Sequence, residues 1–247
     1  MIESEPIRRR KLSHEVLDRL LARITRGELT AGDHLPSERD LMSQYGVGRP
    51  AVREALQALE RMGFLAITHG ERARIIAPTA RTMIDQVALS AKHLLSTSPT
   101  SLEHLKEARV FFERGMVRIA AEQATKTDIT RLRQRLADHE VVARTVLSST
   151  GQRDEFLQKD MAFHREIAAI SGNAIYVALI EAMFEWLAEF HSGLVRVRGA
   201  EQLTITEHTA ILERIAAGDA DGAARAMTEH LTRANALYRQ FERAAGD

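Results

Sequence analysis

The sequence predicts a mostly α-helical protein in two parts, a mixed N-terminal part and a wholly helical C-terminal part. All five prolines lie in the first 99 of 247 residues, so the commonest helix breaker is absent from more than half of the chain. Beyond that point, apolar residues recur at intervals of three and four, the period of an amphipathic helix. With 45% hydrophobic and 28% charged residues, the chain is globular rather than disordered or collagen-like.

Composition excludes several classes of protein. The sequence has no cysteine, which excludes disulfides, thiolate zinc sites and cysteine nucleophiles. Lys plus Arg and Asp plus Glu each number 34, so the overall charge favours no class of partner. The longest apolar run is too short to span a bilayer, and no apolar segment follows the charged start. We therefore expect a cytoplasmic protein.

The N-terminal part begins with three predicted helices. Apolar residues fall on one face over residues 14–26, and a glycine ends this first helix. Ser37 follows a proline and is a typical helix start, the Tyr-Gly-Val-Gly of residues 45–48 predicts a tight turn, and Pro50 occupies a tolerated first-turn position of a third helix. Two short helices joined by a glycine-containing turn predict a helix-turn-helix.

A β-hairpin wing is predicted next, because apolar and polar residues alternate on both sides of a central His-Gly-Glu over residues 64–76. We expect a winged helix-turn-helix domain at 1–77, a linker at 78–82, and an all-helical domain of six to seven helices at 83–247. The first of these holds 13 basic and 11 acidic residues, and the rest of the chain 21 and 23. The neutral total therefore hides a weakly basic N-terminal domain.

Two arginines begin the third predicted helix. Arg49 and Arg53 lie one turn apart, where a recognition helix meets base edges in the major groove of double-stranded DNA. A guanidinium can bind guanine O6 and N7 together, which is worth about 1–3 kcal/mol of discrimination. The alternative is that each arginine only pairs with a carboxylate such as Glu38, Glu54 or Glu60. The whole set of basic residues favours DNA binding.

Three motifs carry a family resemblance. Leu-Pro-Ser-Glu-Arg-Asp-Leu at 35–41, Gly-Val-Gly-Arg-Pro-Ala-Val-Arg-Glu-Ala-Leu at 46–56 and the His-Gly pair of the wing resemble the winged helix-turn-helix of the GntR family of bacterial transcription regulators, over about residues 12–77. Gly48 departs from the serine of many members, which removes one hydroxyl contact to phosphate. The resemblance implies these DNA contacts: Arg39, Arg49, Arg53, His69 and Gly70. Arg72 would add a phosphate contact, which positions the protein on DNA without specifying the base sequence.

The apolar stripes of the C-terminal helices contain polar residues. Arg109 lies among apolar residues of one helix, Asp160 and His164 share a face at i and i+4, and His208 and His230 interrupt two further stripes. Buried polar groups need partners, and the simplest common partner is a divalent metal, most suitably Zn²⁺, with Ni²⁺ or Mn²⁺ as alternatives. For each histidine alone a hydrogen-bonded core residue remains the alternative, as does a helical ion pair between Asp160 and His164.

The same residues carry a second resemblance, to the helical effector-binding (FCD) domain of the FadR-type GntR subfamily. It implies that Asp160, His164, His208 and His230 bind the metal, and that Arg109 holds a ligand carboxylate. Metal, arginine and aspartate together would leave about two positive charges in the cavity, which favours an anion. We therefore expect a small carboxylate effector, a sugar acid or another organic acid.

Within the subfamily, the sequence looks most like the sialic-acid-responsive regulators, through residues 46–56, 70–74 and 111–113. Most of these residues lie outside the expected cavity, so a sialic acid is one candidate among the carboxylates. The remaining histidines, His139 among them, fit none of the stripes and are expected at the surface or in packing.

These observations predict a DNA-binding transcriptional regulator, a repressor, whose operator binding is controlled by the carboxylate. It should be a homodimer formed through its helical domain, because one recognition helix covers few base pairs and a symmetric dimer reads two half-sites. The alternatives are a regulator that senses the metal itself and a metal-dependent hydrolase. A hydrolase needs a general base, and Glu207 and Glu229 point roughly 100° away from the stripes of the adjacent histidines.

Overall fold

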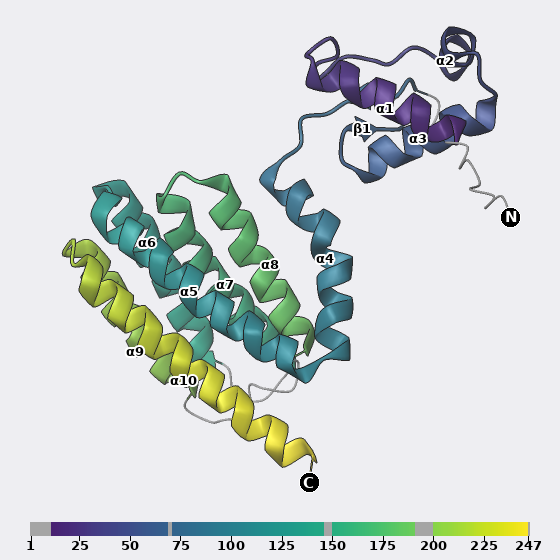
Figure 1. The fold of residues 1–247 in the computed structure, drawn as a ribbon. Helices are drawn as coiled ribbons and strands as arrows, with labels where there is room; N and C mark the ends of the chain where they lie inside the picture. Colours follow the sequence, from purple (N-terminus) through teal and green to yellow (C-terminus); the bar gives the residue numbers. More distant parts are fainter. Residues whose placement is uncertain (1–10, 69–70, 146–149, 191–199, 247) are drawn as a thin grey trace, which may run out of the picture. The chain divides into compact units, whose positions relative to one another are not determined.

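The computed structural model describes residues 11–68, 71–145, 150–190 and 200–246. It confirms the predicted fold class, an N-terminal winged helix-turn-helix followed by a wholly helical part (Figure 1). The chain divides into two compact units, residues 1–86 and 87–247, which are described separately below. None of the helices in the described ranges is both long and apolar enough to cross a membrane.

The N-terminal unit contains three helices and a short hairpin: α1 (Leu12–Thr25), α2 (Glu38–Tyr45), α3 (Arg49–Arg61), β1 (Leu65–Ala66) and β2 (Arg74–Ile75). The strands are antiparallel and shorter than the sequence predicts, with Leu65 opposite Ile75. Both helices α1 and α2 pack against α3, around buried leucines and valines contributed by all three. The recognition helix α3 is thus held from one side, and its N-terminal residues stay exposed.

Local sequence explains the turn of this motif. The Ser37 hydroxyl accepts a hydrogen bond from the Asp40 backbone N–H, and the Asp40 carboxylate accepts one from the Ser37 N–H, so the two residues form a capping box at the start of α2. Gly46 ends α2 with a φ of 64°, a left-handed conformation that costs glycine little. These two features fix where α2 begins and ends.

The remaining helices are α4 (Ala80–Thr97), α5 (Pro99–Gln123), α6 (Lys126–Thr145), α7 (Thr150–Ile170), α8 (Ala174–Phe190), α9 (Ala200–Ala216) and α10 (Ala220–Gly246). Helix α4 begins inside the segment 78–82 expected as a linker. Thr79 and Thr82 exchange hydrogen bonds between backbone N–H and side-chain hydroxyl, and this reciprocal capping starts the helix there.

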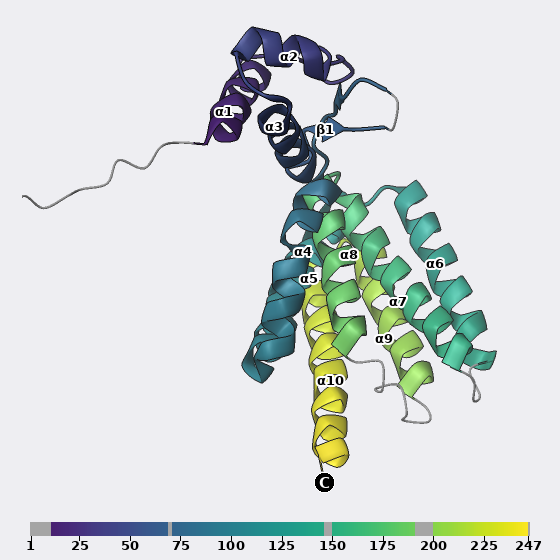
Figure 2. The ribbon, with the colours of Figure 1, turned by 90° about the vertical axis from the view of Figure 1, so that its right-hand side faces the viewer.

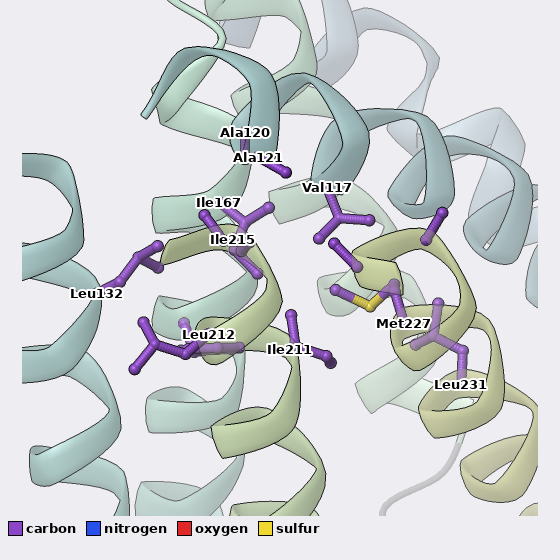
Figure 3. Packing of buried hydrophobic residues seen from close by; sticks show 13 residues of the cluster. Val117, Ala120, Ala121, Leu132, Ile167, Ile211, Leu212, Ile215, Met227 and Leu231 are labelled. Atoms are coloured by element: carbon purple, nitrogen blue, oxygen red, sulfur yellow. The ribbon is translucent and has the colours of Figure 1, made fainter. Parts of the chain in front are cut away.

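Helix α5 is central to the bundle, since α7, α8, α9 and α10 all pack against it (Figures 1 and 2). Helix α6 packs on α7 and α9 from the other side. One apolar cluster, drawn in Figure 3, joins α5, α6, α7, α9 and α10. Its members include Val117, Leu132, Ile167, Ile211 and Met227. Because these helices converge, the polar residues on their inner faces are brought together as well.

Candidate DNA-binding surface and metal centre

The exposed start of α3 carries the two arginines expected to read DNA. Arg49 and Arg53 both face Glu38 of α2, with distances from arginine Nε to the carboxylate of 3.7 and 2.9 Å. Each arginine side chain is still 62% exposed. In the DNA-free protein, therefore, both arginines do pair with a carboxylate, because Glu38 holds both guanidinium groups at the start of α3. Such exposed pairs are weak and can exchange for a base or a phosphate.

The other predicted contacts lie around the same helix. Arg39 is exposed on α2, and Arg72 lines a groove of about 390 Å³ together with Arg53 of α3. His69 and Gly70 lie outside the described residues. For Arg39, Arg49, Arg53 and Arg72 the DNA contact remains a prediction.

In the helical unit, four side chains predicted as metal ligands converge from three helices. Asp160 and His164 come from α7, His208 from α9 and His230 from α10, and one donor atom of each lies within 4.8 Å of all the others. His208 Nε2 is 3.4 Å from Asp160 Oδ1 and 3.3 Å from His230 Nε2. His164 Nε2 is 3.9 Å from Asp160 Oδ1. Residues 70 positions apart in the sequence thus share one small polar centre.

The inner atoms of this centre suit a cation. Asp160 Oδ1 and His164 Nε2 are buried and have no hydrogen-bond partner within the described part of the chain. Unpaired buried polar atoms are rare because each loses its hydration without compensation. Three imidazoles and one carboxylate form a donor set that suits a divalent transition metal. The helical ion pair between Asp160 and His164 is present, but its 3.9 Å separation is too long for a hydrogen bond, so it satisfies neither atom.

Two histidines of the centre are oriented by carboxylates behind them. His164 Nδ1 donates a short hydrogen bond to Glu113 Oε2 of α5, and His230 Nδ1 donates to Glu207 Oε2 of α9 over 2.7 Å. A histidine that donates from Nδ1 keeps Nε2 without a proton and available to a metal. The carboxylates therefore select the tautomer in which Nε2 faces the centre.

The charge states of these residues agree with that arrangement. Burial lowers the pKa of His208 and of His230, although Glu207 raises the latter, so both imidazoles are neutral as metal binding requires. Burial would raise the pKa of Glu113, but its interactions with His164 and with the Arg109 guanidinium outweigh burial and lower the pKa to about 2. Glu113 is therefore ionised at any physiological pH.

Arg109 lies next to the centre and is almost fully buried. Its Nε donates to Glu113 Oε1 over 2.5 Å, and its guanidinium stacks on the Phe184 ring, 4.0 Å from the centroid. Glu113 therefore contacts both the arginine and the histidine His164. This corrects the expected charge of the centre: a bound divalent metal, Arg109, Asp160 and the ionised Glu113 together carry about one positive charge, and not two.

Sequence reasoning missed three residues at this centre. Glu113 and Glu207 lie behind the ligand histidines, and His139 of α6, expected at the surface or in packing, is fully buried with its ring 5.4 Å from that of His208. Neither Glu113 nor Glu207 interrupts an apolar stripe in a way that signals its partner. The signal available in the sequence was the position of Glu113 four residues after Arg109, which puts the two side chains on one face of the helix.

Fold and site together define a DNA-binding transcription regulator with a helical regulatory domain. The chain belongs to the GntR family: residues 12–75 match the family described as bacterial regulatory proteins, gntR family, and residues 104–233 match the FCD domain. FCD domains bind a metal in some members of that family.

Relatives support the same assignment over nearly the whole chain. The chain is 40% identical over 228 residues to the HTH-type transcriptional repressor NanR of Cronobacter sakazakii, covering 92% of this chain and 85% of that protein. It is 37% identical over 242 residues to the HTH-type transcriptional repressor NanR of Escherichia coli K12, covering 97% of this chain and 89% of that protein. The protein is therefore a regulator and not an enzyme, which removes the hydrolase alternative.

Two solved structures share the fold. Streptococcus agalactiae GntR superposes with a TM-score of 0.66 at 22% identity, covering 92% of this chain and 99% of that one. E. coli McbR/YncC superposes with a TM-score of 0.52 at 19% identity, covering 94% of this chain and 100% of that one. At these identities the likeness concerns the fold alone.

Proposed function

We propose that this protein is a metal-dependent, ligand-responsive transcriptional repressor, whose operator binding is controlled by a small carboxylate bound in the helical unit. The cluster of Asp160, His164, His208 and His230 carries the proposal. Two of its inner atoms, Asp160 Oδ1 and His164 Nε2, have no hydrogen-bond partner among the described residues, and two of its imidazoles are oriented by carboxylates. Zn²⁺ suits this donor set best, with Ni²⁺ and Mn²⁺ as alternatives. When bound, the metal supplies positive charge and coordination positions for an oxygen ligand. Because operator DNA of bacteria lies in the cytoplasm, the protein acts there.

The charge of the centre favours a carboxylate effector. A total of about one positive charge, with the metal included, suits one carboxylate group in buried surroundings. Arg109 offers the matching guanidinium, and Glu113 fixes its position. Sugar acids and small organic acids fit this description, and the resemblance of residues 46–56, 70–74 and 111–113 to the sialic-acid-responsive regulators makes a sialic acid the first sugar acid to test.

A melting screen tests the effector class. Zinc-loaded protein is heated with N-acetylneuraminate, lactate, citrate, gluconate or an uncharged sugar, and a bound acid raises the melting temperature by mass action. A hit is then titrated against operator DNA. We expect an acid to change operator affinity only with metal present. If metal alone changes operator affinity and none of the acids does, the protein is a metal sensor and the effector proposal is wrong.

Arg109→Gln should weaken effector binding while keeping the metal. Glutamine can still donate to Glu113 but loses the charge, and a hydrogen bond to a charged group is worth about 1.5–3 kcal/mol, so affinity for the acid should fall about tenfold or more. Calorimetric titration of the zinc-loaded variant measures the change. Arg131→Gln is the matched control, because Arg131 pairs with Glu166 away from the centre. Equal acid affinity in wild type and Arg109→Gln would remove Arg109 from the effector site.

We further propose that the outer face of α5 joins two copies of the chain. Phe111 is 75% exposed and adjoins an apolar pocket of about 370 Å³, lined by Met116 and Tyr176 among others. Gly115 lies beside them with open space at its Cβ position, which lets another helix approach closely. This face therefore has both an exposed aromatic side chain, Phe111, and an apolar pocket beside it, as a surface that pairs with its own copy requires.

The charges beside this pocket also suit a second copy. Arg114 and Arg118 of α5 share a groove with Asp221 and Glu229 of α10, so both signs occur on one face. A two-fold axis places a surface against itself, which requires such self-complementarity. A partner of a single charge sign would match only half of the groove.

Phe111→Asp should convert the dimer to a monomer. An aromatic anchor is worth about 2 kcal/mol or more and occurs twice in a symmetric interface, so dimer affinity should fall on the order of 1,000-fold. Light scattering after gel filtration at micromolar concentration measures the mass. Val141→Asp is the control, because Val141 is 64% exposed on α6, outside the pocket. A Phe111→Asp protein that remains dimeric would contradict this interface.

A further inference from the structure

One histidine of the metal centre lacks the support that the other two have. His164 donates from Nδ1 to Glu113, and His230 donates from Nδ1 to Glu207. His208 Nδ1 is buried and has no hydrogen-bond partner among the described residues. The three imidazoles are therefore not equivalent, although all of them belong to the same cluster.

The free nitrogen of His208 has to be a donor if the proposed metal is bound. Its Nε2 faces the cluster, 3.4 Å from Asp160 Oδ1 and 3.3 Å from His230 Nε2. Nε2 can bind a metal only without a proton, which leaves the proton of the neutral ring on Nδ1. A buried N–H without an acceptor is costly, and an oriented acceptor strengthens the histidine as a ligand.

Two rings from neighbouring helices pack against His208. The Phe163 ring is stacked on it with centroids 4.3 Å apart and an interplanar angle of 14°, and it offers no lone pair. The His139 ring of α6 lies 5.4 Å away at 49°. Both nitrogens of His139 are buried and have no hydrogen-bond partner in the part of the chain that the structure describes, so this ring offers an acceptor near the Nδ1 donor of His208.

We infer that His139 is a positioning residue of the metal centre, whose imidazole accepts the hydrogen bond from His208 Nδ1 when His208 Nε2 binds the metal. This inference rests on the proposed metal-dependent function. It gives all three histidines an acceptor at Nδ1: Glu113 for His164, Glu207 for His230, and His139 for His208.

The surroundings of His139 suit this task. Its ring is fully buried and packs on Phe156 with centroids 4.3 Å apart, surroundings that favour an uncharged imidazole with one lone pair. Rotation of the ring about its bond to Cβ redirects that lone pair without moving the backbone of α6. A neutral acceptor also adds no charge to the centre, unlike a third carboxylate.

The test compares zinc affinity, by competition with a chelator, in full-length wild type, His139→Leu, His139→Phe, His139→Gln and His208→Ala. Leucine and phenylalanine remove the acceptor, and zinc affinity should fall about 10- to 100-fold with one zinc still bound per chain. Glutamine restores an acceptor oxygen, and its affinity should lie within about threefold of wild type. The use of both leucine and phenylalanine separates loss of the acceptor from a change in ring volume.

Melting of the metal-free proteins is the second readout. Removal of an unpartnered buried imidazole should leave the melting temperature of metal-free His139→Leu unchanged or raised, while its zinc affinity falls. A purely structural role predicts a lower melting temperature and no rescue by glutamine, and either result would overturn the inference. Unchanged zinc affinity in both apolar variants, or loss of zinc stoichiometry as in His208→Ala, would also overturn it. Wild type that binds no zinc would instead refute the proposed function.

Discussion

Arg53→Ala should abolish specific operator recognition. A bidentate arginine–guanine contact is worth about 1–3 kcal/mol, and a dimer makes it at two half-sites, so operator affinity should fall roughly 30-fold or more. In the DNA-free protein Arg53 is bound to Glu38 over 2.9 Å, so the substitution also frees a carboxylate at the start of α3, where it repels phosphate. Fluorescence anisotropy with operator and scrambled duplexes at fixed salt measures both affinity and specificity.

The matched control is Arg61→Ala, at the opposite end of the same helix. It removes the same charge from α3 but should lower the affinities for operator and scrambled DNA equally and modestly. Zinc content should be the same in both variants, because the metal centre lies in the other unit. Sequence-specific binding retained by Arg53→Ala would mean that α3 does not read bases through this residue.

His208→Ala should abolish metal binding and the stability that depends on it. His208 is fully buried at the middle of the cluster, within 3.4 Å of both Asp160 and His230, so its loss removes the ligand that lies between them. A metal present at 100 times its Kd stabilises the folded state by about 2.7 kcal/mol, equivalent to about 5–10 °C for a unit of this size. Wild type with zinc should therefore melt about 5–10 °C above wild type with chelator.

For His208→Ala the two melting curves should coincide, and elemental analysis of untagged protein should find almost no zinc. His104→Ala is the control, because His104 is exposed on α5 and should leave both the zinc content and the melting difference intact. An unchanged zinc stoichiometry in His208→Ala would refute the site.

Much of the fold follows from local chemistry. Ser37, Gly46 and Pro50 lie at helix boundaries where a capping hydroxyl, a left-handed glycine and a proline without N–H are each favoured, so the boundaries could be read from the sequence. The wing strands are shorter than alternation predicts. Helix α4 begins at Ala80, earlier than expected, because Thr79 and Thr82 cap each other directly after Pro78.

The candidate metal ligands were also recognisable, since a polar residue on an apolar stripe points inward with its helix. Asp160, His164, His208 and His230 each interrupt such a stripe, and the structure brings all four together. Periodicity gives the face of a helix on which a residue lies. It does not give the residue of another helix that this face meets.

The sequence by itself therefore determined the helices, the inward direction of the polar residues and the family of the protein. Tertiary structure alone decided the partners: Glu113 of α5 contacts His164 and Arg109, Glu207 of α9 contacts His230 of α10, and His139 of α6 packs by His208. Glu207 does point away from the stripe of its own helix, as the helical period requires, but the packing of α10 against α9 places His230 on that side. Such contacts depend on the offset and rotation of packed helices, which are set by the whole core rather than by any local run of residues.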